Sequence, residues 1–274
     1  MKAKLLKLIG GLAGAAAVAA GVVYLFEDFF IFWPSRRLHG APDPPFHDIA
    51  LEPAPGTHIY GWHIPHPLPR AMVIYFQGNG GNRSDRVAHV EMLRGMAVSV
   101  LLVDYEGYGV SEGSTSEAAV YRDAREIIEW VRRDSKLREL PLVYYGESLG
   151  GAVATQMALE NPPHALIIDH SFTTMGEMID RVCRGVPLRY VCRSRFNSIE
   201  NLSGYHGPVL VIHGEEDRLI PILHGQRLFE AANNPKWFLS IPGAGHNHND
   251  LLRIGGAAYR AGIYAFLDET LKRV

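Results

Sequence analysis

The stretch Tyr144-Tyr-Gly-Glu-Ser-Leu-Gly-Gly151 decides the fold of this 274-residue chain. It ends a short apolar run that is typical of a buried strand, and it precedes an apolar run that is typical of a buried helix. A Gly-x-Ser-x-Gly sequence at such a junction predicts a sharp turn whose flanking positions tolerate almost no side chain. The turn would expose the hydroxyl of Ser148 and aim the backbone N–H of Leu149 at an oxyanion. The pattern therefore predicts a nucleophilic serine, with an incidental serine in a glycine-rich turn as the alternative.

A nucleophilic serine of this kind requires an acid and then a histidine further along the chain. An acidic loop follows a later buried-strand run, and in it we choose Asp217 as the acid over its neighbours Glu215 and Glu216. A further strand-like run leads into a glycine-rich loop that ends at His246. Because the carboxyl ends of parallel strands meet at one edge of a sheet, these residues are predicted to meet Ser148 as a catalytic triad.

These three blocks resemble the catalytic segments of the α/β-hydrolase superfamily, and two upstream segments narrow the resemblance. Phe76-Gln-Gly-Asn-Gly-Gly-Asn82 is similar to the His-Gly-Asn-x-x-Asn oxyanion loop of that superfamily, with Gln77 in place of the usual histidine. Asp104-Tyr-Glu-Gly-Tyr-Gly-Val-Ser-Glu-Gly113 is similar to its Asp-Tyr-Arg-Gly-Tyr-Gly-x-Ser-Glu-Gly segment. Together with Phe30-Ile-Phe-Trp-Pro-Ser35, the pattern resembles the Bem46-like, ABHD13/ABHD17-type membrane-anchored serine hydrolases.

This resemblance, which runs from about Phe30 to the C-terminus, implies an α/β-hydrolase fold and a serine hydrolase without cofactor or metal. It implies an oxyanion hole formed by the backbone N–H groups of Asn79 and Leu149, so that Gln77 should tune the oxyanion loop without abolishing it. We predict cleavage of a carboxylic ester or thioester with an acyl or lipid-like chain, through an acyl-serine intermediate. A serine peptidase of the aminopeptidase type and a non-catalytic binding module are the alternatives.

The composition and the order of the predicted elements agree with one large α/β domain. With 47% hydrophobic residues, 20% charged residues and a net charge of −2, the chain gives no indication of a nucleic-acid partner. Strand-like runs alternate with helical patterns, which predicts a mostly parallel central sheet flanked by helices. The strands are expected at 57–64, 71–77, 97–104, 140–145, 165–169, 209–213 and 236–241, with an antiparallel edge strand at 46–51. The helices are expected near 83–94, 116–133, 151–161, 222–231 and 257–271.

Residues 1–29 are predicted to be a membrane anchor or signal segment ahead of a hydrolase domain at 30–274. Leu8–Phe26 is a run of nineteen residues without a charge, which is long enough to cross a bilayer as a helix. Lysines at positions 2, 4 and 7 and acidic residues directly after the run favour a cytoplasmic N-terminus and a catalytic domain on the periplasmic or extracellular side. The small-x-small sequence Ala17-Val-Ala19 leaves a cleaved signal peptide and a secreted protein as the alternative. A buried helix is a further alternative.

A segment at about 172–205, between the sixth and seventh strands of the sheet, is predicted to form a cap of short helices over the active site. We call it the cap segment. It interleaves apolar residues with arginines, which suits contact with acyl chains and anionic headgroups but equally an ordinary lid with solvated arginines. Cys183 and Cys192 lie in it, and they form a disulfide in an oxidising location or remain two thiols in a reducing one.

His246-Asn-His-Asn-Asp250 also has the spacing of a metal site, because zinc favours imidazole and carboxylate ligands. Leu251 stands where a metallo-hydrolase of that type carries a further histidine, and no other cluster completes the ligand set. We therefore interpret His246 as catalytic and the residues after it as the start of the last helix.

Overall fold

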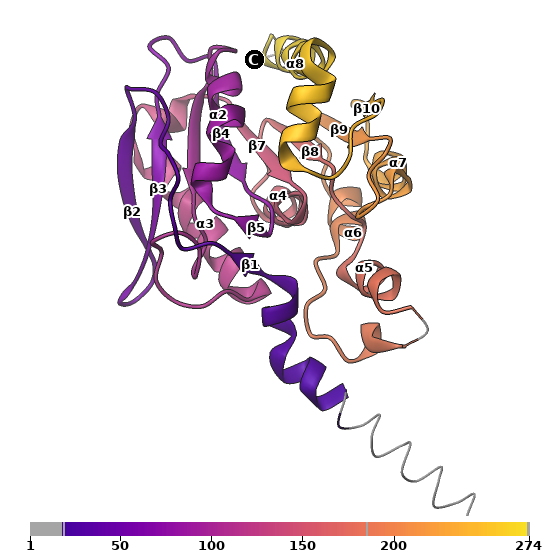
Figure 1. Ribbon diagram of the computed structural model, residues 1–274. Coiled ribbons are helices and arrows are strands. Elements are labelled where there is room, and N and C mark those ends of the chain that lie inside the picture. The colour runs from indigo at the N-terminus through magenta and orange to yellow at the C-terminus, as the bar shows by residue number, and fades with distance from the viewer. Residues whose placement is uncertain (1–17, 19, 185, 273–274) are drawn as a thin grey trace, which may run out of the picture.

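A mostly parallel sheet forms the centre of the computed structural model, which describes residues 18, 20–184 and 186–272 (Figure 1). Its eight strands lie in the order β10-β9-β8-β7-β4-β6-β3-β2. They are β2 (His47–Ala54), β3 (Thr57–Ile64), β4 (Met72–Phe76), β6 (Ser99–Val103), β7 (Leu142–Glu147), β8 (Ala165–Asp169), β9 (Val209–Gly214) and β10 (Lys236–Ile241). β2 pairs antiparallel with β3, and β3 with β6, whereas the other neighbours are parallel. The predicted sheet and its antiparallel edge strand are confirmed.

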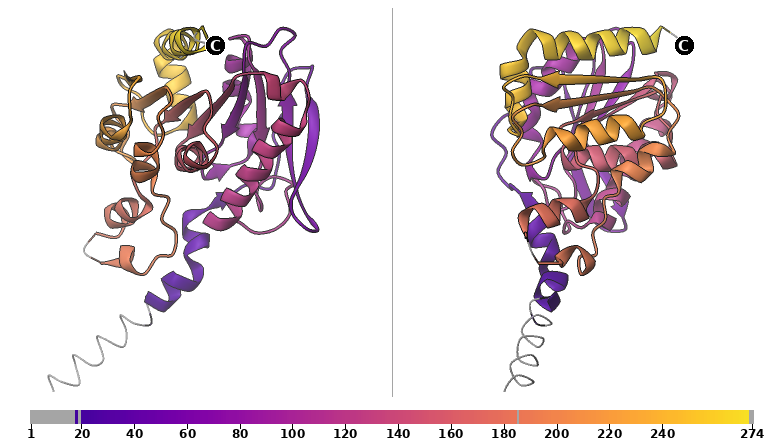
Figure 2. Two further views of the ribbon diagram at one scale, coloured as in Figure 1. Left: turned by 180° about the vertical axis from the view of Figure 1, so that it is seen from behind. Right: turned by 90° about the vertical axis from the view of Figure 1, so that its right-hand side faces the viewer.

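Helices cover both faces of this sheet (Figure 2). They are α2 (Val87–Arg94), α3 (Glu117–Arg133), α4 (Leu149–Glu160), α5 (Met175–Val182), α6 (Ser198–Ser203), α7 (Ile222–Ala231) and α8 (His248–Leu271). Short 3₁₀ turns lie at Arg83–Arg86, Leu137–Glu139 and Leu188–Tyr190. Side chains alternate along β4: Ile74 packs in the core that contains α3 and α4, and Val73 in the core that contains α2 and α8. Burial on both faces explains why the central strands are apolar throughout.

Two features of the fold differ from what the sequence pattern predicted. The last helix begins at His248, as expected for the residues after His246, but it is interrupted at Gly256, which has a φ of +46°. The predicted helix at 257–271 is thus the part after this interruption. In addition, β1 (Trp33–Pro34) and β5 (Gly80–Gly81) form a small parallel pair outside the main sheet. Strands of only two residues carry too little periodicity to be found in a sequence.

The cap segment contains the short helices that were predicted, α5, the turn Leu188–Tyr190 and α6. Cys183 and Cys192 are both free thiols in it, so the structure has the two-thiol form and not the disulfide. The cap segment and the N-terminal helix extend on the same side of the molecule, which is the side on which β1 lies (Figure 1).

The predicted span Leu8–Phe26 falls largely outside the described residues. Its described end belongs to a helix at 20–31 that leads directly into β1. Within the described part of the chain, no helix combines the length and the apolar character that crossing a membrane requires.

Candidate active site

Ser148 lies in a sharp turn between β7 and α4. Its backbone has a φ of 52° and a ψ of −116°, which is strained for a residue with a side chain. The turn is compact enough to require glycine on both sides. A Cβ atom on Gly146 would lie 2.4 Å from the carbonyl oxygen of Gly150, and a Cβ atom on Gly150 would lie 1.9 Å from that of Phe76. The backbone N–H of Ser148 donates to the carbonyl oxygen of Asp169 at 2.9 Å, which helps to retain the strained conformation.

The three predicted triad residues form one series of hydrogen bonds. Ser148 Oγ lies 3.2 Å from His246 Nε2, and His246 Nδ1 lies 2.7 Å from Asp217 Oδ2. The other carboxylate oxygen of Asp217 accepts two backbone N–H groups of its own loop, at 2.9 and 2.8 Å. Burial raises the pKa of Asp217, but the hydrogen bond and charge of His246, the backbone N–H of Ile220 and the charge of His213 together outweigh it, so the pKa lies below its usual value. Glu215 and Glu216 are exposed, whereas Asp217 is buried and its Oδ2 faces the imidazole.

A pocket of about 540 Å³ surrounds the serine. Asn79, one of the two residues assigned to the oxyanion hole, lines it together with Ser148. Leu149 is the first residue of α4, where a backbone N–H has no acceptor within the helix. The described residues that line the pocket are Gly78, Asn79, Gly80, Gly81, Asp85, Arg86, Glu147, Ser148, His170, His246 and Asn247. No residue of the cap segment is among them, so the segment lies beside this pocket and does not cover it.

Gln77, which replaces the usual histidine of the oxyanion loop, does not line the pocket. Its side chain is buried, and Nε2 donates to Asp104 Oδ1 at 2.9 Å. Asp104 in turn pairs with the guanidinium of Arg83 at 2.5 Å. The side chain at position 77 therefore bonds within the core, and the next residues of the loop, Gly78 and Asn79, line the pocket.

A buried ion pair that the sequence did not reveal supports the oxyanion loop. Arg86 Nε lies 2.8 Å from Glu147 Oε2 and Nη2 lies 3.0 Å from Oε1, while the hydroxyl of Tyr75 donates to Oε2 at 2.7 Å. A Cβ atom on Gly78 would lie 3.3 Å from Arg86 Nη2, so the guanidinium lies against the loop. Burial raises the pKa of Glu147, but Arg86 and nearby groups bring it well below its usual value. The pair links the loop to the residue before Ser148.

His170 is a second histidine beside the triad. Its ring lies edge-on to that of His246, with 4.9 Å between centroids, and its Nδ1 is 3.0 Å from Asp169 Oδ1. Burial lowers the pKa of His170, but the charge and hydrogen bond of Asp169 raise it above its usual value overall. The residue follows β8 directly. The strand-end argument that located His246 would have located it too.

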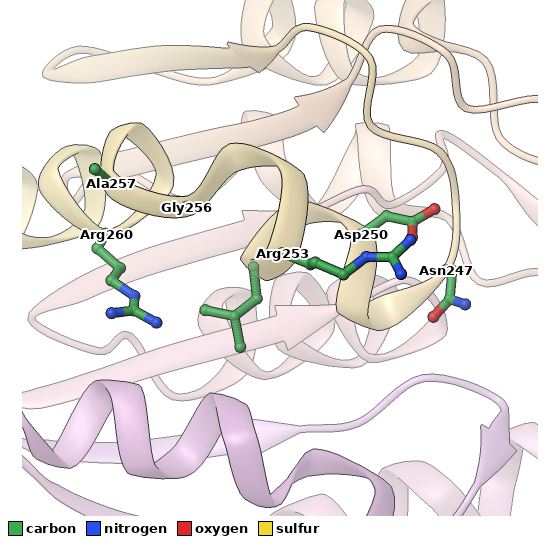
Figure 3. A pocket seen from close by; sticks show the side chains of 7 residues that line it. Asn247, Asp250, Arg253, Gly256, Ala257 and Arg260 are labelled. Atoms are coloured by element: carbon green, nitrogen blue, oxygen red, sulfur yellow. The ribbon is translucent and has the colours of Figure 1, made fainter.

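A second hollow of about 1020 Å³ lies along the first turns of α8 (Figure 3). Its lining includes Asn247, which also lines the serine pocket, so the two hollows adjoin. Figure 3 shows the side chains of Asp250 and Arg253 close together on this helix, and Arg253 Nη2 lies 3.4 Å from Asp250 Oδ1. The larger hollow contains no triad residue. We therefore assign the chemistry to the smaller pocket.

The metal-like spacing after His246 does not form a ligand cluster. His246 Nδ1 faces Asp217, and Asp250 pairs with Arg253. Among the described residues, no group of three or more histidine, cysteine, aspartate and glutamate side chains is arranged to bind a metal ion.

Comparison with known proteins gives a consistent result. The family model "Serine aminopeptidase, S33" matches residues 67–179. The uncharacterized protein Rv2307c of Mycobacterium tuberculosis is 35% identical over 283 residues, 98% of each chain. The lysophosphatidylserine lipase ABHD12 of Danio rerio is 29% identical over 69% of this chain and 59% of that protein. Among solved structures, the Pyrococcus furiosus esterase Pf2001 superimposes with a TM-score of 0.72 at 17% identity, covering 87% of this chain and 99% of the esterase.

Proposed function

Because this chain belongs to the α/β-hydrolase superfamily, we propose that it is a serine hydrolase that cleaves a carboxylic ester or thioester with an acyl or lipid-like chain. The observation that carries the proposal is the series of hydrogen bonds from Ser148 Oγ through His246 to Asp217, in one pocket with Asn79. A strained serine at the end of a parallel strand, with an imidazole on its hydroxyl, is suited to attack a carbonyl carbon.

In the proposed reaction, His246 Nε2 takes the proton of Ser148 as its oxygen bonds to the carbonyl carbon. Asp217 keeps Nδ1 protonated and stabilises the imidazolium that forms. The backbone N–H groups of Leu149 and Asn79 stabilise the negative oxygen of the tetrahedral intermediate. The intermediate then collapses, the leaving group takes the proton from His246, and the acyl group remains on Ser148. Water repeats the sequence and releases the acid.

One relative supports a lipid-like substrate. Danio rerio ABHD12 is described as a lysophosphatidylserine lipase. The family model is described as a serine aminopeptidase, which makes a peptide bond at an N-terminus the second candidate. Initial rates on aryl esters, acyl thioesters and aminoacyl anilides distinguish the two. Faster turnover of the anilides would overturn the ester assignment.

We also propose that the protein acts at a membrane. Large apolar side chains are exposed on the N-terminal helix and on the cap segment, at Val22, Tyr24, Leu25, Phe26, Phe29, Phe30, Val182, Val186 and Tyr190. Those from Val22 to Phe26 belong to the uncharged run Leu8–Phe26, and the charge bias favours a catalytic domain on the non-cytoplasmic side. The full-length protein should stay with membranes after carbonate extraction, and external protease should reach the domain in spheroplasts. A mature N-terminus near Ala20 would instead establish a cleaved signal peptide.

Labelling with a fluorophosphonate tests the central assignment. Wild-type protein should be labelled, and Ser148→Ala should lose both the label and the hydrolysis of an aryl ester. Circular dichroism should show that the variant is folded, and Ser171→Ala, a change at a nearby serine outside the triad, should keep the label. Retained labelling or turnover in Ser148→Ala would overturn the proposed mechanism.

A further inference from the structure

Residues 31–37 cross the oxyanion loop and bond to it at every second residue; we call them the strap. The backbone N–H of Trp33 donates to the carbonyl oxygen of Asn79 at 3.1 Å, and that of Ser35 donates to the carbonyl oxygen of Gly81 at 2.9 Å. These bonds belong to the small parallel pair of β1 and β5. Each residue of the strap is 45 or more positions away in the chain from the loop residue to which it bonds, so these are tertiary contacts.

Asn79 is fixed by the strap through its side chain as well as its backbone. Its Nδ2 donates to the carbonyl oxygen of Ile31 at 2.8 Å, while its own carbonyl oxygen accepts from Trp33 and, at 2.7 Å, from the hydroxyl of Tyr108. With the amide and the carbonyl of Asn79 both bonded in this way, the residue has little freedom to rotate. Its backbone N–H is the group assigned to the oxyanion.

Asn82 connects the far end of the loop to the same strap. Its Nδ2 donates to the carbonyl oxygens of Ser35 and Arg37, at 3.0 and 2.8 Å. Its Oδ1 faces the other way and accepts the backbone N–H of Ser84 at 2.9 Å, which caps the 3₁₀ turn Arg83–Arg86. One buried side chain therefore joins the strap, the oxyanion loop and the following turn.

The strap is itself secured at its N-terminal end. The carboxylate of Glu27, buried in the last turns of the helix at 20–31, accepts the backbone N–H groups of Arg193 and Ser194 at 2.6 and 2.9 Å. Arg193 also pairs with Asp28 at 2.9 Å. Hydrogen bonds therefore join the cap segment to the N-terminal helix, this helix continues in the chain as the strap, and further hydrogen bonds join the strap to the oxyanion loop.

We propose that the strap is a positioning element for the oxyanion hole, so that the peptide bond of Trp33, far from the triad in sequence, sets how well Asn79 stabilises the tetrahedral intermediate. This inference rests on the proposed function. The strap would then contribute to turnover, in addition to connecting the N-terminal helix to the hydrolase domain.

The expected effect is on kcat, because the oxyanion forms only after the substrate is bound. Loss of one oxyanion-hole donor costs roughly 10²–10³-fold in kcat, and a donor that is displaced without being lost should cost less. We therefore expect a decrease of about tenfold when one strap bond is removed, with KM nearly unchanged. A role in folding alone would lower stability and leave kcat per folded molecule intact.

Two substitutions at one exposed position test this in the full-length protein. Trp33→Pro removes the backbone N–H that bonds to Asn79, whereas Trp33→Ala removes the indole, which is 69% exposed, and keeps that N–H. With a water-soluble aryl ester, Trp33→Pro should lower kcat about tenfold and Trp33→Ala less than about twofold. Equal kcat values for the two variants, at similar melting temperatures, would overturn the inference.

Asn82→Asp decides the question if Trp33→Pro does not fold. The new carboxylate still caps the 3₁₀ turn but cannot donate to Ser35 and Arg37, so kcat per folded molecule should fall. The melting temperature should fall as well, because the buried charge then faces two carbonyl oxygens, so kcat is measured at a temperature where the variant is folded. A wild-type kcat in this variant would count against the strap. The two proposals fail separately: turnover in Ser148→Ala overturns the serine mechanism, whereas an inactive Ser148→Ala with unaffected strap variants overturns only the positioning role.

Discussion

The loops around Ser148 are held by buried polar pairs and by contacts that only glycine permits, whereas the cap segment carries large apolar side chains on an exposed face. Around the serine, the Arg86–Glu147 pair is buried. Glu117 of α3 accepts the backbone N–H groups of two cap-segment residues, Arg195 and Phe196, each at 2.7 Å. Val182 and Tyr190 remain 70% and 77% exposed.

This difference predicts different effects for substitutions near Ser148 and for substitutions on the exposed face of the cap segment. A change near Ser148 leaves a buried charge or a strained backbone without support, so it should affect stability and turnover together. A change on the exposed face of the cap segment removes only surface, so it should affect the choice and presentation of substrates and spare the chemistry. Four changes test this contrast, in order of the size of effect expected.

The acid of the triad should show the largest effect. Asp217→Asn keeps the shape of the side chain but no longer holds the imidazole in its reactive tautomer, so kcat should fall by roughly 10³–10⁴-fold. Glu216→Gln, one residue away on the same loop, should stay within about twofold of wild type, since its side chain is exposed. Steady-state kinetics on an aryl ester measure both. A larger loss in Glu216→Gln would show that the wrong acid has been assigned.

Breaking the buried ion pair should come next. Arg86→Leu leaves the carboxylate of Glu147 buried without its partner, which should lower the free energy of unfolding by about 3–5 kcal/mol. Urea denaturation at pH 7 measures this loss. The double variant Arg86→Leu/Glu147→Leu should recover a large part of it, because no charge then remains unpaired. An additive loss in the double variant would mean that the charges are not coupled.

Glu147 should also make the stability depend on pH. Its pKa in the folded protein lies below the unfolded value of about 4.3, so the carboxylate stabilises the fold above that pH. This contribution should be lost as the pH falls through the folded-state pKa. Unfolding free energies measured from pH 6 down to pH 3 should decrease less steeply for Glu147→Gln than for wild type. Parallel curves would show that Glu147 does not contribute to acid sensitivity.

The smallest effect is expected on the cap segment. Val182→Ser together with Tyr190→Ser should leave hydrolysis of a water-soluble ester unchanged, because neither residue lines the serine pocket. Hydrolysis of a long-chain ester presented in anionic vesicles should fall a few-fold. Leu68→Ser, at a residue that is 82% exposed outside the cap segment, is the matched control and should change neither rate. Equal losses in the double variant and in Leu68→Ser would remove the case for a membrane-facing cap segment.

Much of the fold could be predicted because its signals are local. β3, β8, β10 and α7 begin and end where the apolar pattern predicted, since periodicity and turn residues act over a few neighbours. The interruption of α8 at Gly256 was missed, because the adjacent Gly255 and Gly256 do not by themselves show whether a helix continues on both sides of them. The small strand pair of β1 and β5 was missed because it depends on chain segments that meet only in the folded state.

The sequence by itself determined the order and the strand-end positions of Ser148, Asp217 and His246, because a few adjacent residues determine where each strand ends and which turn follows it. Only the tertiary structure decided which acid of the loop faces the imidazole, at 2.7 Å. Tertiary structure also decided that Arg86 pairs with Glu147, 61 residues away, and that Asn79 is bonded to a strap 48 residues before it. Such contacts depend on how distant segments pack, and no local pattern encodes which partner is met.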